Sequence, residues 1–541
     1  MHDLKSVERA HFTSEDAAQI SGAIALVYDA LQKGHVDDAR RRAKHLLDTY
    51  PASPALFMLA GEAEFTGGAV DAALDFFERA IAIEGGDARL HIRKAQLLLI
   101  SGERLSARKA AAHAAQLPPE TAEVCWQAAS IHANSNDPLT AVELYRRALS
   151  HAGDSTPLLY ALASSEFFTG DFSAADEHLA RLLKLSPQFG HALYLRATLR
   201  RQSLERNHIS DLKSRMRLGF RDKASQAACM YALAKELEDV GEDTHAFAFL
   251  SEGARLMRST LSYNVESECR AIADVREASS AVAMARAKPG DEDDGAIFIV
   301  GMPRSGTTLV ERMLAGQDGP APAGELLDFG NALAAAAQEV RGNAPERSAA
   351  QAALDVDYQR LGARYMRTAR QAANGSHRFV DKMPVNYLYC GMILKALPNA
   401  RIIHLARDPL DTCFAVYKTL FYNAYHFSYD LTELAKYYVA YHETMQHWHR
   451  VLPGRILDVR YEDLVASPDN HALKIREWCG LPTRNASVND LHQLSSRPFS
   501  TASAAQVREP VHTRSVHRSR RHMKGMAPAI AVLRAAGIRI D

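Results

Sequence analysis

Small and helix-breaking residues punctuate amphipathic stretches at a fixed interval in the first half of the chain. Gly34, Gly68, Gly102, Asn136 and Gly170 follow one another every 34 residues. An alanine stands five positions after each of them, and a proline or glycine stands seventeen positions after. This pattern predicts pairs of short helices, with the glycine or asparagine at a turn that tolerates left-handed backbone. The later breaker ends the second helix of each pair.

The 34-residue unit resembles the tetratricopeptide repeat. An irregular helical bundle is the alternative, but three separate markers in phase over five units favour the repeat. We therefore predict an all-α tetratricopeptide-repeat solenoid over residues 1–204. After Ala197 the phase slips, and a weaker unit around Gly241 and Ala246 marks residues 205–286 as degenerate helical repeats and connector. A solenoid groove suits a polypeptide partner or acceptor.

Beyond a polar, breaker-rich linker at residues 287–295 the pattern changes. Short apolar runs rich in β-branched residues alternate with longer helical stretches. The runs lie at residues 296–300, 378–380, 401–405 and 455–459. Strands alternating with helices predict an α/β domain over residues 296–541, with a parallel sheet and ligands at the carboxyl ends of its strands.

Charge and cysteine content limit the function classes. Lys plus Arg total 64, as do Asp plus Glu, so no overall field favours nucleic acid or a membrane surface. The six cysteines lie far apart, in no paired or zinc-like spacing, which suits free thiols in a reducing compartment. No apolar run approaches the ~20 residues of a membrane span, and the first residues carry no secretory pattern. We expect a cytoplasmic protein.

A glycine-bounded loop follows the first predicted strand, in the segment GMPRSGTTL from Gly301 to Leu309. Loop amides, hydroxyls and the start of the next helix form a cradle for an anion. Gly301 and Gly306 have the spacing of a Walker A loop, but Thr307 stands where that motif requires lysine. The positive charge lies inside the loop at Arg304. A P-loop kinase stays an alternative that the missing lysine disfavours.

The string PRSGTTL closely resembles the 5′-phosphosulfate loop of sulfotransferases, and the resemblance extends along most of residues 296–541. It is nearest to bacterial proteins that fuse such repeats to a domain similar to tyrosylprotein sulfotransferases. The resemblance implies a P-loop-like sulfotransferase domain that uses 3′-phosphoadenosine 5′-phosphosulfate. The implied loop contacts are Arg304, Ser305, Gly306, Thr307 and Thr308. No metal is expected, because cationic side chains suffice for the singly charged sulfuryl group.

Further donor contacts follow from the same resemblance. Arg407, in an Arg-Asp-Pro sequence after a strand, matches the residue that binds the 3′-phosphate. The serine that assists it in the family is replaced by Ala415, and we expect Thr412 or Thr419 to supply the missing hydrogen bond. The segment from residue 497 to residue 524 contains seven Lys or Arg and only one acidic residue. The remaining residues that match nucleotide contacts, one after the last strand and the others in this basic segment, are Tyr461, Ser503, Gln506, Arg508 and Arg518.

Four residues are candidates for the chemistry. Glu325, in a Gly-Glu pair 21 residues after Arg304, matches the general base of the tyrosylprotein enzymes. Lys382, in the segment DKMPVN, matches the lysine that stabilises the bridging oxygen. Arg304 and Ser503 complete the set by neutralising charge on the transferring group and leaving phosphate. The alternative interpretation of Glu325 and Lys382 is a pair of exposed charges at a helix start and a strand end.

Sulfuryl transfer to an acceptor hydroxyl is thus the predicted activity. The rival hypothesis is a repeat-based binding scaffold whose nucleotide-binding domain is weakened, as Ala415 hints. The repeats are expected to be separable, so that deleting Met1–Gly290 leaves nucleotide binding intact. Three histidines on one predicted helix, His442, His447 and His449, are interpreted as a packed or solvated face rather than a metal site.

Overall fold

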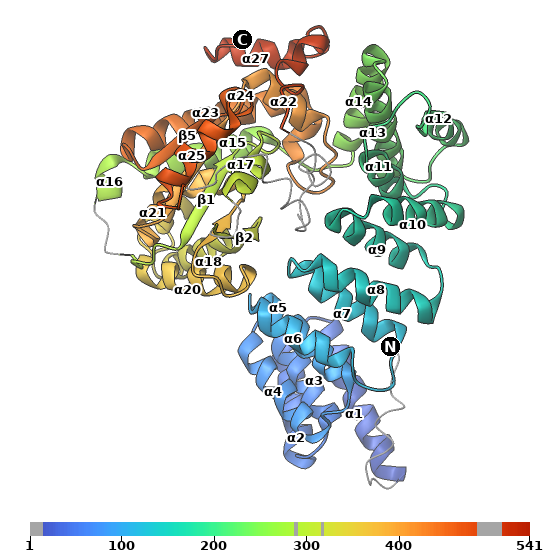
Figure 1. Cartoon of the computed structure of the whole chain (residues 1–541). Coiled ribbons are helices and arrows are strands. Elements are labelled where there is room, and N and C mark those ends of the chain that lie inside the picture. Colours follow the sequence, from blue (N-terminus) through green and yellow to red (C-terminus); the bar gives the residue numbers. More distant parts are fainter. Residues whose placement is uncertain (1–13, 286–289, 315–318, 484–510, 541) are drawn as a thin grey trace. The chain divides into compact units, whose positions relative to one another are not determined.

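The computed structural model describes residues 14–285, 290–314, 319–483 and 511–540 (Figure 1). The chain divides into two compact units, Met1–Gly153 and Asp154–Asp541. No helix in the described ranges is long and apolar enough to span a bilayer. All six cysteines are free thiols, as their spacing predicted.

The first unit is a stack of antiparallel helix pairs. Its helices are α1 (Ser14–Gln32), α2 (Val36–Thr49), α3 (Pro54–Thr66), α4 (Val70–Ile83), α5 (Ala88–Ile100), α6 (Arg104–Ala114), α7 (Ala122–Asn134) and α8 (Pro138–Ala152). The turn residues of the repeat have φ between 61° and 89°, and its alanines are fully buried. At Gly61 a Cβ would approach the Phe77 ring to 2.7 Å, which explains the small residue there. The predicted repeat solenoid is confirmed.

The second unit begins with further helices of the same kind. They are α9 (Thr156–Thr169), α10 (Phe172–Leu185), α11 (Gly190–Thr198), α12 (Ile209–Leu218), α13 (Lys223–Asp239), α14 (Asp243–Arg258), α15 (Val265–Ala278) and α16 (Ala281–Ala285). Helices α13 and α14 pack tightly on each other, and Gly241 turns between them with φ of 88°. The weak unit that the sequence marked at Gly241 is therefore a helix pair, separated from the regular repeats by α12 and its loop.

A five-stranded parallel sheet follows, in the order β2-β3-β1-β4-β5. Its strands are β1 (Ala296–Gly301), β2 (Ala321–Gly324), β3 (Phe379–Asp381), β4 (Arg401–Ala406) and β5 (Ile456–Arg460). Four of them match the predicted runs to within one residue at each end. The edge strand β2 was not predicted, because its sequence APAG has neither β-branched residues nor alternation.

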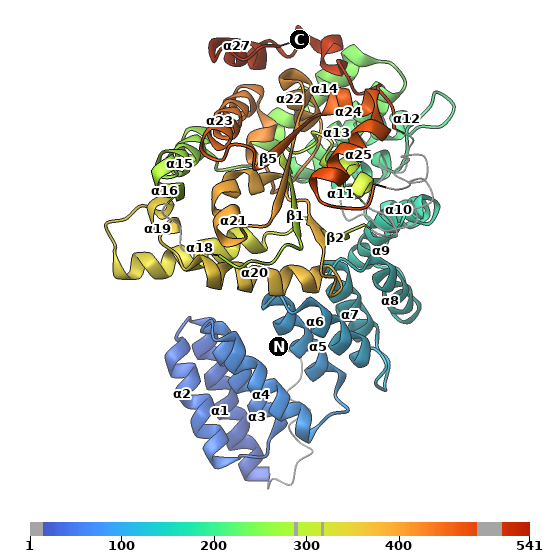
Figure 2. The ribbon, with the colours of Figure 1, turned by 60° about the vertical axis from the view of Figure 1, so that its left-hand side comes forward.

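Helices cover both faces of the sheet (Figure 2). The α/β helices are α17 (Thr307–Leu314), α18 (Asp328–Asn343), α19 (Ala349–Ala353), α20 (Tyr358–Ala372), α21 (Cys390–Ala396), α22 (Pro409–Tyr417), α23 (Leu431–Val451), α24 (Tyr461–Ala466), α25 (Pro468–Trp478) and α27 (Ala527–Ala535). Along β1, Phe298 packs toward α18 and α20, whereas Ile297 and Ile299 pack toward α17 and α25. This alternation between two cores is the expected burial of a central parallel strand.

The last helices before the sheet share one hydrophobic core with it. Tyr231 of α13 is 1% exposed and donates a hydrogen bond from its hydroxyl to the Tyr417 carbonyl at 3.2 Å. The Leu420 amide donates to the Tyr194 hydroxyl of α11 at 3.1 Å. The predicted boundaries at residues 204, 286 and 295 remain predictions, but in packing residues 154–541 form one body.

Candidate functional site

A cavity of about 980 Å³ lies beyond the carboxyl ends of the strands. The loop after β1, the end of β2, the loop after β3, helix α22 and Tyr461 after β5 all reach it. Two further walls come from elsewhere in the chain. One is the C-terminal segment, defined as residues 511–522. The other is the connector, defined as residues 198–239, which contributes Thr198, Leu199, Arg200, Arg201, Lys235, Glu238 and Asp239.

The loop after β1 is a tightly folded cradle. Gly306 has φ of 109°, and a Cβ there would lie 2.7 Å from the Tyr461 ring, so only glycine fits. Arg304 adopts left-handed backbone with φ of 63°, although it is not a glycine. The Ser305 hydroxyl is buried and has no hydrogen-bond partner among the described residues. Helix α17 begins at Thr307, so its first amides point into the cavity.

Arg304 lies among groups from four other parts of the chain. Burial, the largest influence, lowers the pKa of its guanidinium, and the nearby Arg407 lowers it further. Tyr194 of α11, Glu325 and Tyr461 act in the opposite direction and raise this pKa. The predicted donor contact Arg304 and the predicted base Glu325 thus influence each other electrostatically, and Tyr194 of α11 influences Arg304 as well.

Arg407 occupies the start of α22 as the sequence predicted. Asp408 caps the helix by accepting from the Asp411 amide at 2.8 Å, and Pro409 is its first residue. Arg407 donates to the Arg304 carbonyl at 3.2 Å and to the Ser515 carbonyl at 2.6 Å. Its guanidinium carbon lies 4.6 Å from the centre of the Tyr461 ring. Its Nε is buried without a hydrogen bond to any described residue.

The C-terminal segment is fastened to α22 by one carboxylate. Asp411, which is 1% exposed, accepts hydrogen bonds from the His517 and Ser519 amides at 2.6 and 2.9 Å. The bond from Arg407 to the Ser515 carbonyl adds a second attachment. These contacts bring Arg518 to the cavity, and its contact with a nucleotide stays a prediction. Ser503, Gln506 and Arg508 lie outside the described residues.

The expectation for Thr412 and Thr419 is wrong. Thr412 donates its hydroxyl proton to the Asp408 carbonyl at 2.8 Å, and Thr419 donates to the Ala415 carbonyl at 2.9 Å. Each hydroxyl therefore satisfies a carbonyl one turn earlier in its own helix. A cation stands nearby instead, since Lys418 lines the cavity one turn beyond Ala415.

Glu325, directly after β2, and Lys382, directly after β3, form an ion pair. The Lys382 side chain is 2% exposed, whereas that of Glu325 is 35% exposed and lines the cavity. The interpretation of Lys382 as an exposed strand-end charge is therefore wrong. A second carboxylate, Glu311 of α17, is buried close by. Burial raises the pKa of Glu311, and although Lys382 lowers it, Glu325 raises it further.

Asp381, which the sequence analysis did not single out, fixes this pair. Its carboxylate accepts from the Leu326 amide at 3.4 Å and from the Met383 amide at 3.1 Å. It also accepts from the Tyr365 hydroxyl at 2.8 Å. One buried group thereby ties the backbone after Glu325 to the backbone after Lys382. Burial raises the pKa of Asp381 to about 7, against the lowering effect of these donors.

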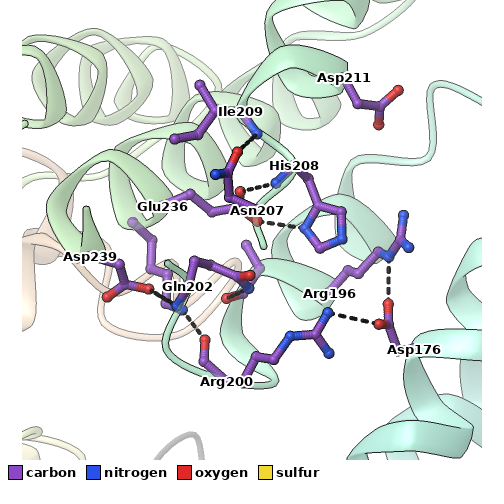
Figure 3. A network of polar contacts seen from close by, with 12 residues as sticks. Asp176, Arg196, Arg200, Gln202, Asn207, His208, Ile209, Asp211, Glu236 and Asp239 are labelled. Carbon is purple, nitrogen blue, oxygen red and sulfur yellow. Dashed lines mark hydrogen bonds and ion pairs between the residues drawn. The ribbon is translucent and has the colours of Figure 1, made fainter. Parts of the chain in front are cut away.

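Acidic side chains fix the irregular loop that carries connector residues to the cavity (Figure 3). Asp176 of α10 accepts from Arg196 at 2.6 Å and from Arg200 at 2.9 Å. Asp239 accepts from the Gln202 amide at 2.9 Å. Glu236, which is fully buried, accepts from both the amide and the ring of His208. The loss of repeat phase after Ala197 thus corresponds to an ordered loop.

The described residues also contain a group that could hold a metal ion: His404, His449 and Asp458. His404 and Asp458 are register partners on β4 and β5, and their side chains hydrogen bond at 2.6 Å. His449 bonds the same carboxylate at 3.1 Å. Burial would raise the pKa of Asp458, but the two imidazoles hold it well below its usual value. These hydrogen bonds satisfy the group without an ion, and a metal-free reaction stays a prediction.

Comparisons with known proteins find a different family in each half of the chain. Residues 296–485 match the model of the sulfotransferase family, and residues 24–88 match the tetratricopeptide repeat. An uncharacterised protein of Aquifex aeolicus is 31% identical over 319 residues, which are 58% of this chain and 42% of that protein. The chain therefore spans less than half of that relative's length.

Two solved structures illustrate the similarity to known proteins. PilF of Pseudomonas aeruginosa is 16% identical with a TM-score of 0.32, over 42% of this chain and 96% of that one. A tetratricopeptide repeat protein of Parabacteroides merdae is 17% identical with a TM-score of 0.31, over 46% of this chain and 94% of that one.

Proposed function

We propose that this chain, which carries a sulfotransferase-family domain behind tetratricopeptide repeats, transfers a sulfuryl group from 3′-phosphoadenosine 5′-phosphosulfate to an acceptor hydroxyl. The observation that supports this most is the arrangement around one cavity. Arg304 and Arg407 line it at the loop after β1 and the end of β4, and the carboxylate of Glu325 lines it too. A cationic cavity beside a carboxylate suits a polyanionic donor and a hydroxyl that must lose its proton.

The donor's 5′-phosphosulfate belongs in the cradle after β1. The hydroxyl of Ser305, which has no hydrogen-bond partner among the described residues, and the amides at the start of α17 would donate to its oxygens. The 3′-phosphate belongs at the start of α22, where the Nε of Arg407 has no hydrogen bond to a described residue. Tyr461 supports Arg407 through its ring face. Ser503, Gln506, Arg508 and Arg518 are assigned to the nucleotide by family resemblance.

In the proposed reaction Glu325 takes the proton of the acceptor hydroxyl as its oxygen attacks sulfur. The bond between sulfur and the bridging oxygen breaks in line, and the leaving group is 3′-phosphoadenosine 5′-phosphate. Lys382 and Arg304 neutralise the charge that grows on the bridging oxygen. Since Lys382 contacts Glu325, the base and the cation are held together before the substrates bind. No metal is needed for any of these steps.

The acceptor is proposed to be a hydroxyl on a polypeptide recruited by the repeats. Tetratricopeptide arrays present extended concave surfaces, and such surfaces bind peptides and proteins. The repeat match supports recruitment of a partner. A cytoplasmic location is proposed with it, because the free cysteines suit a reducing compartment.

Binding of 3′-phosphoadenosine 5′-phosphate is expected to raise the melting temperature of the full chain. A ligand that binds only the folded state at 100 times its Kd stabilises it by about 2.7 kcal/mol. Differential scanning fluorimetry with this nucleotide, adenosine 5′-phosphate and ATP with Mg²⁺ makes the comparison. A shift with ATP and Mg²⁺ alone would indicate a kinase, and no shift with any nucleotide would favour the scaffold.

Replacing Arg407 with alanine is expected to weaken binding of 3′-phosphoadenosine 5′-phosphate by about 10- to 100-fold. A hydrogen bond to a charged group contributes about 1.5–3 kcal/mol, and each 1.4 kcal/mol is tenfold in Kd. Adenosine 5′-phosphate should lose much less, because it lacks the 3′-phosphate. Isothermal titration calorimetry on wild type, Arg407→Ala and the control Arg401→Ala measures this. Arg401 is the first residue of β4, the strand that precedes Arg407. Its guanidinium lies over the Trp478 ring, and it does not line the cavity. Equal losses for both nucleotides would contradict the assignment.

A further inference from the structure

We propose that the connector completes the donor site: Glu238 of α13 holds Lys418 and Arg518 as a cation pair that binds the 3′-phosphate, in place of the hydroxyl absent at Ala415. The inference rests on the proposed function, because it assigns the ligand of that same cavity. It makes Glu238 a positioning residue and Lys418 a specificity residue. Neither follows from the motifs of the α/β domain.

The three side chains come from three different parts of the chain. The Nζ of Lys418, at the end of α22, lies 3.1 and 3.3 Å from the two carboxylate oxygens of Glu238. The Nε of Arg518, in the C-terminal segment, lies 2.8 Å from Oε1 of Glu238, the oxygen that is 3.3 Å from Lys418. The Glu238 side chain is 9% exposed, and all three residues line the cavity. The carboxylate of Glu238 therefore contacts both cations, and no other acid among the described residues contacts either of them.

Lys418 lies on the face of α22 that the donor would contact. Arg407, Asp411, Ala415 and Lys418 follow one another at spacings of four, four and three residues, and all line the cavity. Residues at such spacings share one face of a helix. Lys418 is thus the next side chain along from the position that lacks its serine. An ammonium brings three donors and a charge where the serine would bring one donor.

Glu238 leaves both cations able to bind an anion. Arg518 uses its Nε toward Glu238, and its two terminal nitrogens form no hydrogen bond or ion pair with described residues. Lys418 has three N–H donors, and the carboxylate oxygens accept from at most two of them. The three groups together carry one net positive charge, and Arg407 adds another. Without the carboxylate the two cations would repel each other and move toward solvent.

The position of Glu238 is fixed by the docking of α13. Eight consecutive residues of this helix, 227–234, are buried, so it packs on all sides rather than along one stripe. The hydrogen bond from Tyr231 to Tyr417 lies between α13 and the last residue of α22. A shift of α13 would therefore carry Glu238 away from Lys418. Donor binding should therefore stabilise the docking of α13, and the docking of α13 should strengthen donor binding by the same free energy.

The test compares two nucleotides on full-length variants by isothermal titration calorimetry. Replacing Glu238 with glutamine should weaken the binding of 3′-phosphoadenosine 5′-phosphate by about tenfold in Kd, which corresponds to the loss of one hydrogen bond to a charged group. Adenosine 5′-phosphate should bind as in wild type. Lys418→Met should show the same selective loss, and adding it to Glu238→Gln should cause little further change. Glu242→Gln, in the exposed turn after α13, is the matched control and should leave both affinities unchanged.

The dependence on pH gives a readout that a merely structural role would not produce. Burial lowers the pKa of Lys418 to about 8, Glu238 raises it, and Arg518 and Arg304 lower it. These three charged groups face it from α13, the C-terminal segment and the loop after β1. The titratable His522 of the C-terminal segment lies near them too, and burial lowers the pKa of its ring. Affinity of wild type for the 3′-phosphorylated nucleotide should fall as pH rises through about 8, because Lys418 loses its proton. Lys418→Arg should bind well and remove this fall, since arginine stays charged.

The outcomes separate this inference from the proposed function. If Glu238→Gln keeps the wild-type preference for the 3′-phosphorylated nucleotide, the inference is overturned while the donor assignment stands. The same holds if the pH profile of Lys418→Arg equals that of wild type. If wild type itself binds both nucleotides equally, or neither, the proposed function fails and the inference fails with it. A selective loss in Glu238→Gln, with the pH effect removed in Lys418→Arg, supports both.

Discussion

Replacing Glu325 with glutamine is expected to lower turnover by about 10²–10⁴-fold, the range usual for loss of a positioned general base. Glutamine keeps the shape of the side chain and its hydrogen-bonding reach, but it cannot take the acceptor's proton. The Glu325 side chain is 35% exposed at the cavity, while its partner Lys382 is almost fully buried. Donor affinity should therefore change little, because the phosphate contacts proposed above lie on the loop after β1 and at the start of α22.

The measurement is steady-state turnover, with nucleotide affinity determined on the same preparations. Glu339→Gln, at an exposed position of α18, is the control and should behave as wild type. Glu325→Asp keeps a carboxylate but places it one methylene further from the acceptor. If the carboxylate acts as the base, this variant should recover part of the activity that is lost in Glu325→Gln. Unchanged turnover in Glu325→Gln would leave the residue as an ion-pair partner for Lys382 only.

Deleting residues 1–290 is expected to abolish nucleotide binding, whereas deleting residues 1–153 should preserve it. This reverses the expectation that the α/β domain works without any repeat. Tyr231, Leu250 and Met257 belong to the same core as the residues around α22 and α23. Arg258 forms a bidentate ion pair with Glu433 at 2.7 and 2.8 Å. Removing these partners exposes a large apolar surface, and such surfaces cause misfolding and association.

Residues 154–541 form one compact unit, so a fragment that begins at Asp154 retains the whole cavity wall. Its affinity for 3′-phosphoadenosine 5′-phosphate should equal that of the full chain. If the first repeats recruit the acceptor, sulfation of a macromolecular acceptor should fall while donor binding is kept. Circular dichroism and calorimetry on both fragments make the comparison. A folded fragment 291–541 with full donor affinity would show that the connector is dispensable.

The repeat solenoid could be predicted in detail, because its information is local and repeated. A left-handed turn residue, a small residue at a helix crossing and a breaker recur in every unit, and each has a direct structural cause. Four strands of the sheet could also be predicted, from their apolar runs rich in β-branched residues. The strand β2 was not, since its pairing with β3 depends on the neighbouring sheet rather than on its own residues.

The cradle, Arg407 and the pair of Glu325 with Lys382 could be found because they stand in motifs at strand ends. Glu238 and Lys418 could not, since their contact spans 180 residues and depends on how α13 docks. One signal was present in the sequence. The stretch from Ala227 to Ala234 is apolar on every face, which indicates a helix with partners beyond its own repeat pair. The residue that stands at the end of such a helix is a natural candidate for a shared site.

The role of Asp381 could not be predicted from the sequence for a different reason. It stands beside Lys382 in the sequence, but an acid after a strand is usually a turn residue, and its four donors become visible only in three dimensions. Those donors come from the β2 side, from α20 and from the loop after β3. A group of this kind positions the pair of Glu325 and Lys382 by holding the backbone beside each of them.

The left-handed backbone of Arg304 bears on how this sequence can evolve. An L-residue in that conformation is less stable than glycine by about 1–2 kcal/mol, a sizeable fraction of the stability of an ordinary domain. A requirement for the guanidinium in the proposed reaction would explain why an arginine stands there. In a lineage where that reaction was lost and folding alone was selected, we expect glycine to be the favoured replacement at position 304. The residue at this position should therefore distinguish relatives that keep the proposed chemistry from relatives that have lost it.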